Sequence, residues 1–252
     1  MTETNPAKAG VDLASGHTVH RYDQELAKLR GIILEMGERV VEQTQSAIAA
    51  LLDQDGFQAF RVLDREPQID FLSLDADEEV FRIIVRRQPT AVDLRIVLAL
   101  SKIADNVERA GDKAVRIARQ ALELEELAIG TDHLPDTVKP ALRRLDNHVC
   151  CMFERGIRSV TGFDVTAALG IFEDEPELYD AANEVRKRLT ELEPDAMTSR
   201  QMVSLLTCIH ALDRIGDHAT NIAEQVIYVA LGQDVRYRNR EILIETLRHQ
   251  GY

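Results

Sequence analysis

The 252-residue sequence has no tryptophan, and aromatic residues make up only 5% of it. Its seven prolines and thirteen glycines are also few for its length. An all-β protein needs many turns, so the small number of prolines and glycines argues against one. Because 45% of the residues are hydrophobic and few of these are aromatic, the sequence predicts a core of packed helices.

Other absences narrow the function and the location. The sequence has no long Lys/Arg run and a formal net charge of −13, which excludes nucleic acid as the expected partner. No apolar run approaches the roughly 20 residues of a membrane span, and residues 1–20 lack the apolar segment of a signal peptide. The three cysteines form no CxxC pair and are expected as free thiols. We therefore expect a soluble, cytoplasmic protein that meets a membrane only through its partners.

Common catalytic signatures are missing as well. The sequence contains no GxSxG element, no Walker phosphate-binding loop and no HExxH pair. Nothing in it indicates nucleotide binding or a nucleophile with its base. The sequence therefore predicts a protein that is not an enzyme.

Apolar residues recur every three or four positions from about residue 22 onward, which is typical of amphipathic helices. Pro67 lies inside the second expected helix, where it could kink or break it. Residues 1–19 are expected to form a flexible arm, and the tail 233–252 either a short packed helix or a partner-binding arm. Six long helices are expected, at about 22–53, 57–87, 89–128, 138–160, 165–192 and 198–231.

The chain carries one pattern twice. The pentad Glu108–Asp112 (ERAGD) returns 105 residues later as Asp213–Asp217 (DRIGD), and nine of 29 positions are identical between 94–122 and 199–227. A period of this length with three helices per unit predicts an all-α fold of two tandem, internally duplicated three-helix bundles. The first bundle should span residues 20–128 and the second 132–232.

Each pentad places two acids four residues apart, on one side of a helix. The apolar heptad positions turn these acids outward, together with one more residue per copy. Two interpretations stay open: a solvated face neutralised by nearby arginines, or a site for Mg²⁺, Mn²⁺ or iron, with the histidine favouring a transition metal in the second copy. The candidate ligands are Asp105, Glu108 and Asp112 in the first copy, and His210, Asp213 and Asp217 in the second.

Each pentad also holds a glycine, Gly111 or Gly216, inside a predicted helix. A helix-interior glycine costs about 1 kcal/mol relative to alanine, so we expect a close neighbour there. Crowding by another helix is favoured over approach by a ligand. The remaining histidines show no metal-binding spacing and are expected at the surface or as caps: His17, His20, His133, His148, His218 and His249.

Two segments resemble the signatures of the PhoU family. The first comprises PTAVDLR at 89–95 with KIADNVERAGD at 102–112, and the second is DRIGDHATNIAE at 213–224. Their order and spacing hold across residues 20–232. Ala110 departs from the isoleucine that is common in the family, and this change leaves both acids in place.

The resemblance implies two three-helix bundles side by side, with the pentad acids Glu108, Asp112, Asp213 and Asp217 as ligands of iron, zinc or another metal. It also implies a negative regulator of phosphate uptake and phosphate-starvation signalling, working as a homodimer. Its expected partners are the ATPase subunit of the phosphate ABC transporter and a phosphate-responsive sensor histidine kinase. The alternative is a metal-dependent enzyme or metal-storage bundle that uses the same carboxylates.

Overall fold

The computed structural model describes residues 20–126, 134–193 and 195–252, so the predicted arm 1–19 lies outside the described residues. The described residues form helices and no strand, which confirms the all-α prediction. The helices are α1 (His20–Asp53), α2 (Gly56–Arg87), α3 (Ala91–Glu126), α4 (Lys139–Ser159), α5 (Val165–Thr190), α6 (Ser199–Leu231) and α7 (Arg240–His249).

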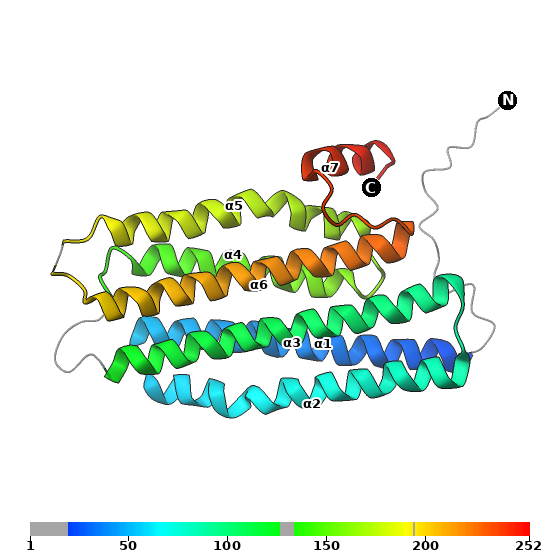
Figure 1. Ribbon diagram of the computed structural model, residues 1–252, viewed down its shortest axis with the longest axis horizontal. Coiled ribbons are helices and arrows are strands. Elements are labelled where there is room, and N and C mark those ends of the chain that lie inside the picture. Colours follow the sequence, from blue (N-terminus) through cyan, green and yellow to red (C-terminus); the bar gives the residue numbers. More distant parts are fainter. Residues whose placement is uncertain (1–19, 127–133, 194) are drawn as a thin grey trace.

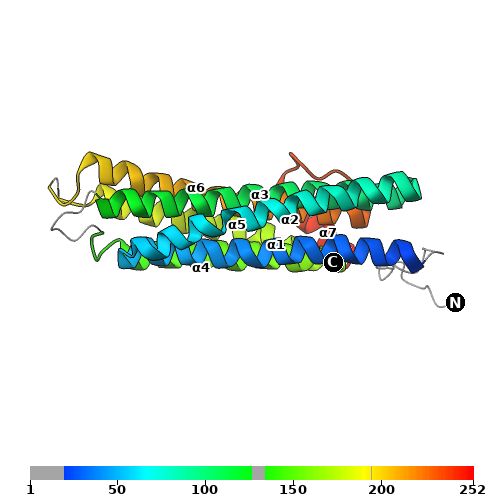
Figure 2. The same ribbon diagram turned by 90° about the horizontal axis from the view of Figure 1, so that it is seen from below.

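The six long helices run along one axis as two three-helix bundles, α1–α3 and α4–α6, that lie side by side (Figures 1 and 2). Helix α3 packs on α6 and α1 packs on α4, whereas α2 and α5 lie on the outer sides. The predicted stripes of α3 and α6, from Ile96 to Ala121 and from Leu205 to Val226, are buried. Buried residues of both bundles form one continuous hydrophobic cluster.

Equivalent residues cap the second helix of each bundle. The Asp55 carboxylate accepts a hydrogen bond from the Gln58 backbone N–H (2.9 Å), and Asp164 accepts one from the Ala167 N–H (3.0 Å). Such caps satisfy N–H groups that the first helical turn leaves without partners. Asp55 and Asp164 are 109 residues apart, so the same N-cap residue begins the second helix of each bundle.

Pro67 does not break α2, which is continuous from Gly56 to Arg87. A proline disrupts the helical ladder in the preceding turn. Gln43 of α1 is buried and donates a hydrogen bond from Nε2 to the Arg65 carbonyl (3.2 Å) in that turn. This contact explains a polar residue in the otherwise apolar stripe of α1.

The tail forms the short helix α7, which packs on α5 with Leu243 and Leu247 buried. Of the two alternatives for the tail, the packed helix is therefore the one observed. Asn239 caps its start by accepting a hydrogen bond from the Ile242 N–H (3.0 Å).

Candidate functional site

The first acidic patch lies on the outer side of α3. Asp105 and Asp112 are exposed, and Glu108 is half-buried between them. Burial raises the pKa of Glu108, and the charges of Asp112, Asp105 and Asp70 raise it further. Within the described chain, Asp105 pairs with Arg109 (3.2 Å), while neither Glu108 nor Asp112 makes an ion pair. A bound cation would relieve this repulsion.

The second patch lies on α6 and is neutralised differently. Asp213 is half-buried and pairs with Arg186 of α5, and Asp217 pairs with Arg214 one turn away (2.7 Å). Burial raises the pKa of Asp213 in spite of the Arg186 charge. His210 is exposed beside them. A cation at this patch would therefore compete with two arginines.

All six candidate ligands thus lie outside the buried stripes, in two separate patches. Among the described residues, no three Asp, Glu, His or Cys side chains come close enough together to hold a metal ion. Each patch therefore offers a pair of carboxylates rather than a complete ligand set, and tight binding would need ligands from another molecule or from water. Metal binding stays a prediction, and it fits the first patch better than the second.

The two pentad glycines occupy equivalent crowded positions. A Cβ at Gly111 would lie 3.1 Å from Cδ1 of Ile69 on α2, and a Cβ at Gly216 would overlap Leu178 on α5. Ile69 and Leu178 are themselves related by the 109-residue offset. These contacts support the predicted helix crowding, and no acid of the patches is among the atoms that approach the glycines.

One polar contact between the bundles was not predicted from the sequence. His218, expected at the surface, is instead 3% exposed and lies at the α3–α6 contact. Its Nδ1 lies 3.0 Å from Oδ1 of Asn106, and Asn221 donates to the same oxygen (3.1 Å). Burial lowers the pKa of His218 to about 4, with the charges of nearby basic residues adding to this effect. The histidine is therefore neutral at pH 7.

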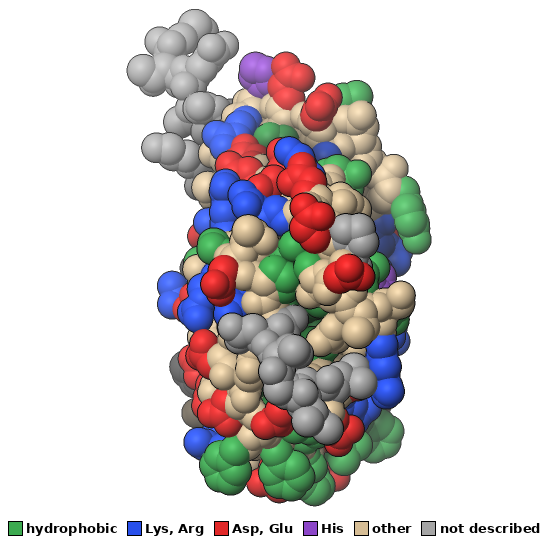
Figure 3. Space-filling view, turned by 90° about the vertical axis from the view of Figure 1, so that its left-hand side faces the viewer, with side chains coloured by type: hydrophobic (Ala, Val, Ile, Leu, Met, Phe, Trp, Pro, Cys, Tyr) green, Lys and Arg blue, Asp and Glu red, His purple; other side chains and the backbone are tan. Residues whose placement is uncertain are grey.

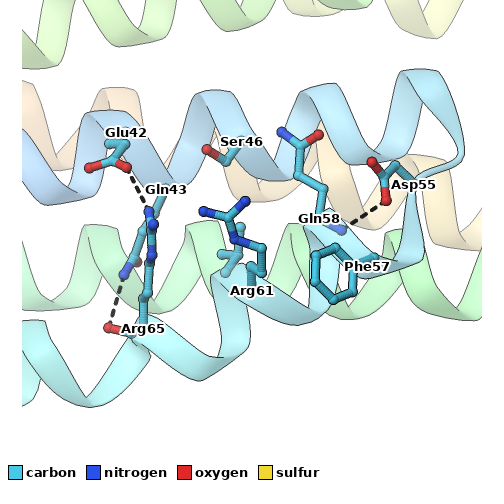
Figure 4. Close-up of a pocket in the computed structure, with 9 residues that line it drawn as sticks. Glu42, Gln43, Ser46, Asp55, Phe57, Gln58, Arg61 and Arg65 are labelled. Atoms are coloured by element: carbon cyan, nitrogen blue, oxygen red, sulfur yellow. Dashed lines mark hydrogen bonds and ion pairs between the residues drawn. The ribbon is translucent and has the colours of Figure 1, made fainter.

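A small polar pocket lies between α1 and α2 (Figure 4). Its volume is about 170 Å³, and its lining residues include Ser46 and Gln58. Arg61 and Arg65 face Glu42 and Asp55 across it, and Arg65 pairs with Glu42 (2.6 Å). Because two positive and two negative groups line it, the pocket has no net preference for an anion such as phosphate.

The structure thus defines a class of protein: a duplicated three-helix bundle with a pair of acids on the solvent-facing side of the third helix of each bundle. The described part of the chain contains no helix long and apolar enough to span a membrane. A family model described as the PhoU domain matches residues 33–121 and again residues 142–226, once in each bundle. The chain therefore belongs to the PhoU family.

Named relatives match nearly the whole chain. The phosphate-specific transport system accessory protein PhoU homolog of a Burkholderia species is 36% identical over 230 residues, 91% of this chain and 97% of the relative. The accessory protein PhoU of Escherichia coli K12 is 32% identical over 222 residues, 88% and 90% of the two chains.

Solved structures agree with the fold. The crystal structure of PhoU from Pseudomonas aeruginosa superposes with a TM-score of 0.76 at 32% identity, covering 84% of this chain and 100% of that one. A PhoU structure from Streptococcus pneumoniae gives a TM-score of 0.74 at 22% identity, covering 85% and 99% of the two chains, and supports the fold alone.

Proposed function

We propose that this chain is a non-enzymatic accessory regulator of phosphate-specific transport that keeps phosphate-starvation signalling off when phosphate is plentiful. The observation that carries the proposal is the double PhoU-domain match within a duplicated bundle. Full-length relatives at 36% and 32% identity bear the name of accessory proteins of that transport system. Nearly complete coverage of both chains supports carrying the role over to the whole chain.

In this proposal the chain is a cytoplasmic adaptor. It contacts the ATPase subunit of the phosphate ABC transporter and a phosphate-responsive sensor histidine kinase, and so reports transporter state to the kinase. An elongated body with two similar bundles offers two related surfaces, which suits a protein that links two partners (Figure 1). The expected homodimer is part of the same proposal and is tested by sedimentation velocity.

We also propose that the acidic patches bind a metal ion and that the partner or solvent completes its coordination. Glu108 and Asp112 would hold it on α3, with Asp105 beside them, and Asp213 and Asp217 would hold it on α6, with His210 beside them. Carboxylate oxygens suit magnesium, manganese or iron, and the histidine nitrogen at the second patch suits iron, manganese or zinc. The metal would supply positive charge at an otherwise repulsive surface.

A deletion strain tests the regulatory role. Deletion of the gene should switch on phosphate-regulated genes in phosphate-replete medium, and a plasmid copy should restore repression. A tagged copy from the same cells should retain the transporter ATPase or the kinase. The proposal fails if the deletion leaves those genes unchanged and neither partner is recovered.

A further inference from the structure

The outer side of α2 is unusually apolar for an exposed surface. Six large apolar side chains on it are between 57% and 75% exposed: Phe57, Phe60, Phe71, Leu74, Phe81 and Val85. Four of the seven phenylalanines of the chain are therefore exposed to solvent on this one helix. Figure 3 shows hydrophobic side chains gathered at the lower edge of the molecule, the edge along which α2 lies in Figure 1.

These six residues, here called the outer stripe, follow a regular spacing. Steps of three and four residues run from Phe57 to Val85, with Asp64, Pro67 and Glu78 at the remaining positions. This is the spacing that a helix uses to pack along another helix. The outer stripe is about 42 Å long at 1.5 Å per residue. In the described chain α2 contacts only α1 and α3, through its opposite side.

The exposed area is large enough for an interface. At about 200 Å² for a whole phenylalanine side chain, the four phenylalanines expose on the order of 500 Å². The largest apolar patch of a typical monomer is roughly 300–600 Å² and is often functional. A standard interface buries about 800 Å² per partner, which the outer stripe and its rim can supply.

In the second bundle, α7 covers the part of α5 that corresponds to the Phe60–Asp64 end of the outer stripe. There α7 lies on the helix with Leu243 and Leu247 buried. Arg248 pairs with Glu173 (2.6 Å), and the guanidinium of Arg240 lies 4.1 Å from the centre of the Phe172 ring. The occupant of α5 is therefore an amphipathic helix with leucines on one side and arginines at its borders.

The equivalent residues of α2 lie 109 positions earlier in the sequence. Phe172 and Glu173 correspond to Leu63 and Asp64, and Leu169 corresponds to Phe60. Leu169 is buried, whereas Phe60 and Asp64 are exposed, and Asp64 makes no ion pair with any described residue. The first bundle thus keeps an apolar and acidic surface at the place where the second bundle receives a helix.

The charges in the middle of the outer stripe favour a basic occupant there, whereas Arg61 and Arg86 are exposed near its two ends. Its middle carries five exposed acids: Asp64, Asp70, Asp75, Asp77 and Glu78. Only Glu78 among them pairs with a described residue, Arg82, at 3.7 Å. A second copy of α2 laid antiparallel along the outer stripe would bring these acids near their own counterparts, which is repulsive. A helix bordered by Lys or Arg would neutralise them.

We propose that the outer stripe of α2 is a docking surface for an amphipathic helix of a partner protein, with an apolar side bordered by lysines or arginines. None of the six apolar residues belongs to an acidic patch, although Asp70 beside the stripe lies near enough to Glu108 to raise its pKa. The proposal holds whether or not the chain regulates phosphate transport, because it rests on the exposure, spacing and charge of α2 and on the α5–α7 contact.

Two designed helical peptides of 28 residues test the proposal on the full chain. Both carry leucines at the apolar heptad positions, and their bordering positions are lysine in one and glutamate in the other. Binding is followed by fluorescence anisotropy, below the concentration at which each peptide associates with itself. The lysine peptide should bind the native chain, and the glutamate peptide should bind at least tenfold more weakly.

Variants locate the binding. The double variant Phe71→Ser/Phe81→Ser should weaken binding of the lysine peptide at least tenfold. Its melting temperature should stay unchanged, since both side chains are mostly exposed. The matched control Tyr179→Ser/Val203→Ser removes exposed apolar groups from α5 and α6 and should leave binding unchanged. Binding that survives in the first variant, or no binding of either peptide, overturns the proposal. So does a native dimer that only the Phe71/Phe81 variant dissociates, because the occupant is then a second copy.

Discussion

His218 of α6 and Asn106 of α3 form a hydrogen bond between the two bundles, 3.0 Å from Nδ1 to Oδ1. The Asn106 amide nitrogen donates to the Lys102 carbonyl (2.8 Å), and this contact turns Oδ1 toward α6. His218 must then carry its proton on Nδ1 and donate it. The duplication does not repeat this contact, because Ala211 and Lys113 stand at the positions equivalent to Asn106 and His218.

Replacing Asn106 by alanine should destabilise the protein. The change leaves the buried Nδ1–H of His218 and the amide of Asn221 without an acceptor, which costs about 1–3 kcal/mol. Urea unfolding should show a lower midpoint with an unchanged slope. Glu154→Ala, which removes an exposed pair with Arg158, should stay within about 0.5 kcal/mol of the native chain. Equal stability of the Asn106 variant would show that the contact is dispensable.

Asp146 should make stability fall as the pH rises through the mildly acidic range. Burial raises the pKa of this carboxyl from 3.8 to about 6, so between these values the folded state binds more protons than the unfolded state. Protonation of Asp146 therefore contributes fully to the free energy of unfolding below pH 3.8. This contribution, roughly 3 kcal/mol, is lost as the pH rises through 6.

The variant Asp146→Asn should flatten this dependence and be more stable than the native chain at pH 7. Asparagine keeps the oxygen that accepts from the Cys150 thiol at 3.4 Å, and it has no charge to bury. Thermal unfolding at several pH values measures the difference. A variant that loses stability at pH 7 would indicate that the ionised carboxylate is needed there.

The two acidic patches should differ in their affinity for a cation. Titration calorimetry with Mn²⁺ should show that Glu108→Gln removes the tighter binding, because Glu108 and Asp112 have no arginine partner in the described chain. Arg186→Ala frees Asp213 and should strengthen binding at the second patch. Identical titrations for all three proteins would count against metal binding at these acids.

Arg240 should hold the tail helix in place. Its guanidinium pairs with Glu224 (2.6 Å), lies 3.5 Å from Glu175 and stacks over Phe172. Arg240→Ala should speed amide hydrogen exchange in α7 while leaving α3 protected, with a stability loss of about 1–2 kcal/mol. Unchanged exchange in α7 would mean that Leu243 and Leu247 suffice.

Patterns along the chain predicted most of the fold. The spacing of apolar residues in α3 and α6 predicted which sides of these helices are buried. The repeated pentads predicted the duplication and the outward direction of the acids. These signals are local, because each follows from the 3.6-residue turn of one helix.

Contacts between helices could not be predicted in the same way. The pairing of Arg186 with Asp213 and the burial of His218 depend on which residues face each other across neighbouring helices. Glu79 shows the same limit: it is 2% exposed and pairs with Lys28 and Arg82 (2.6 and 2.7 Å), which its acidic side chain alone does not reveal. A helical period gives the direction of a side chain but not its partner.

In the proposed role, the chain regulates phosphate signalling by binding proteins of the transport system. The most direct measurement is the binding of the purified full chain to the purified transporter ATPase subunit and to the cytoplasmic part of the kinase, with and without Mn²⁺. We expect specific binding to at least one of them, and exchanging all four pentad acids for their amides should weaken it. Binding to neither protein, in either condition, would contradict it.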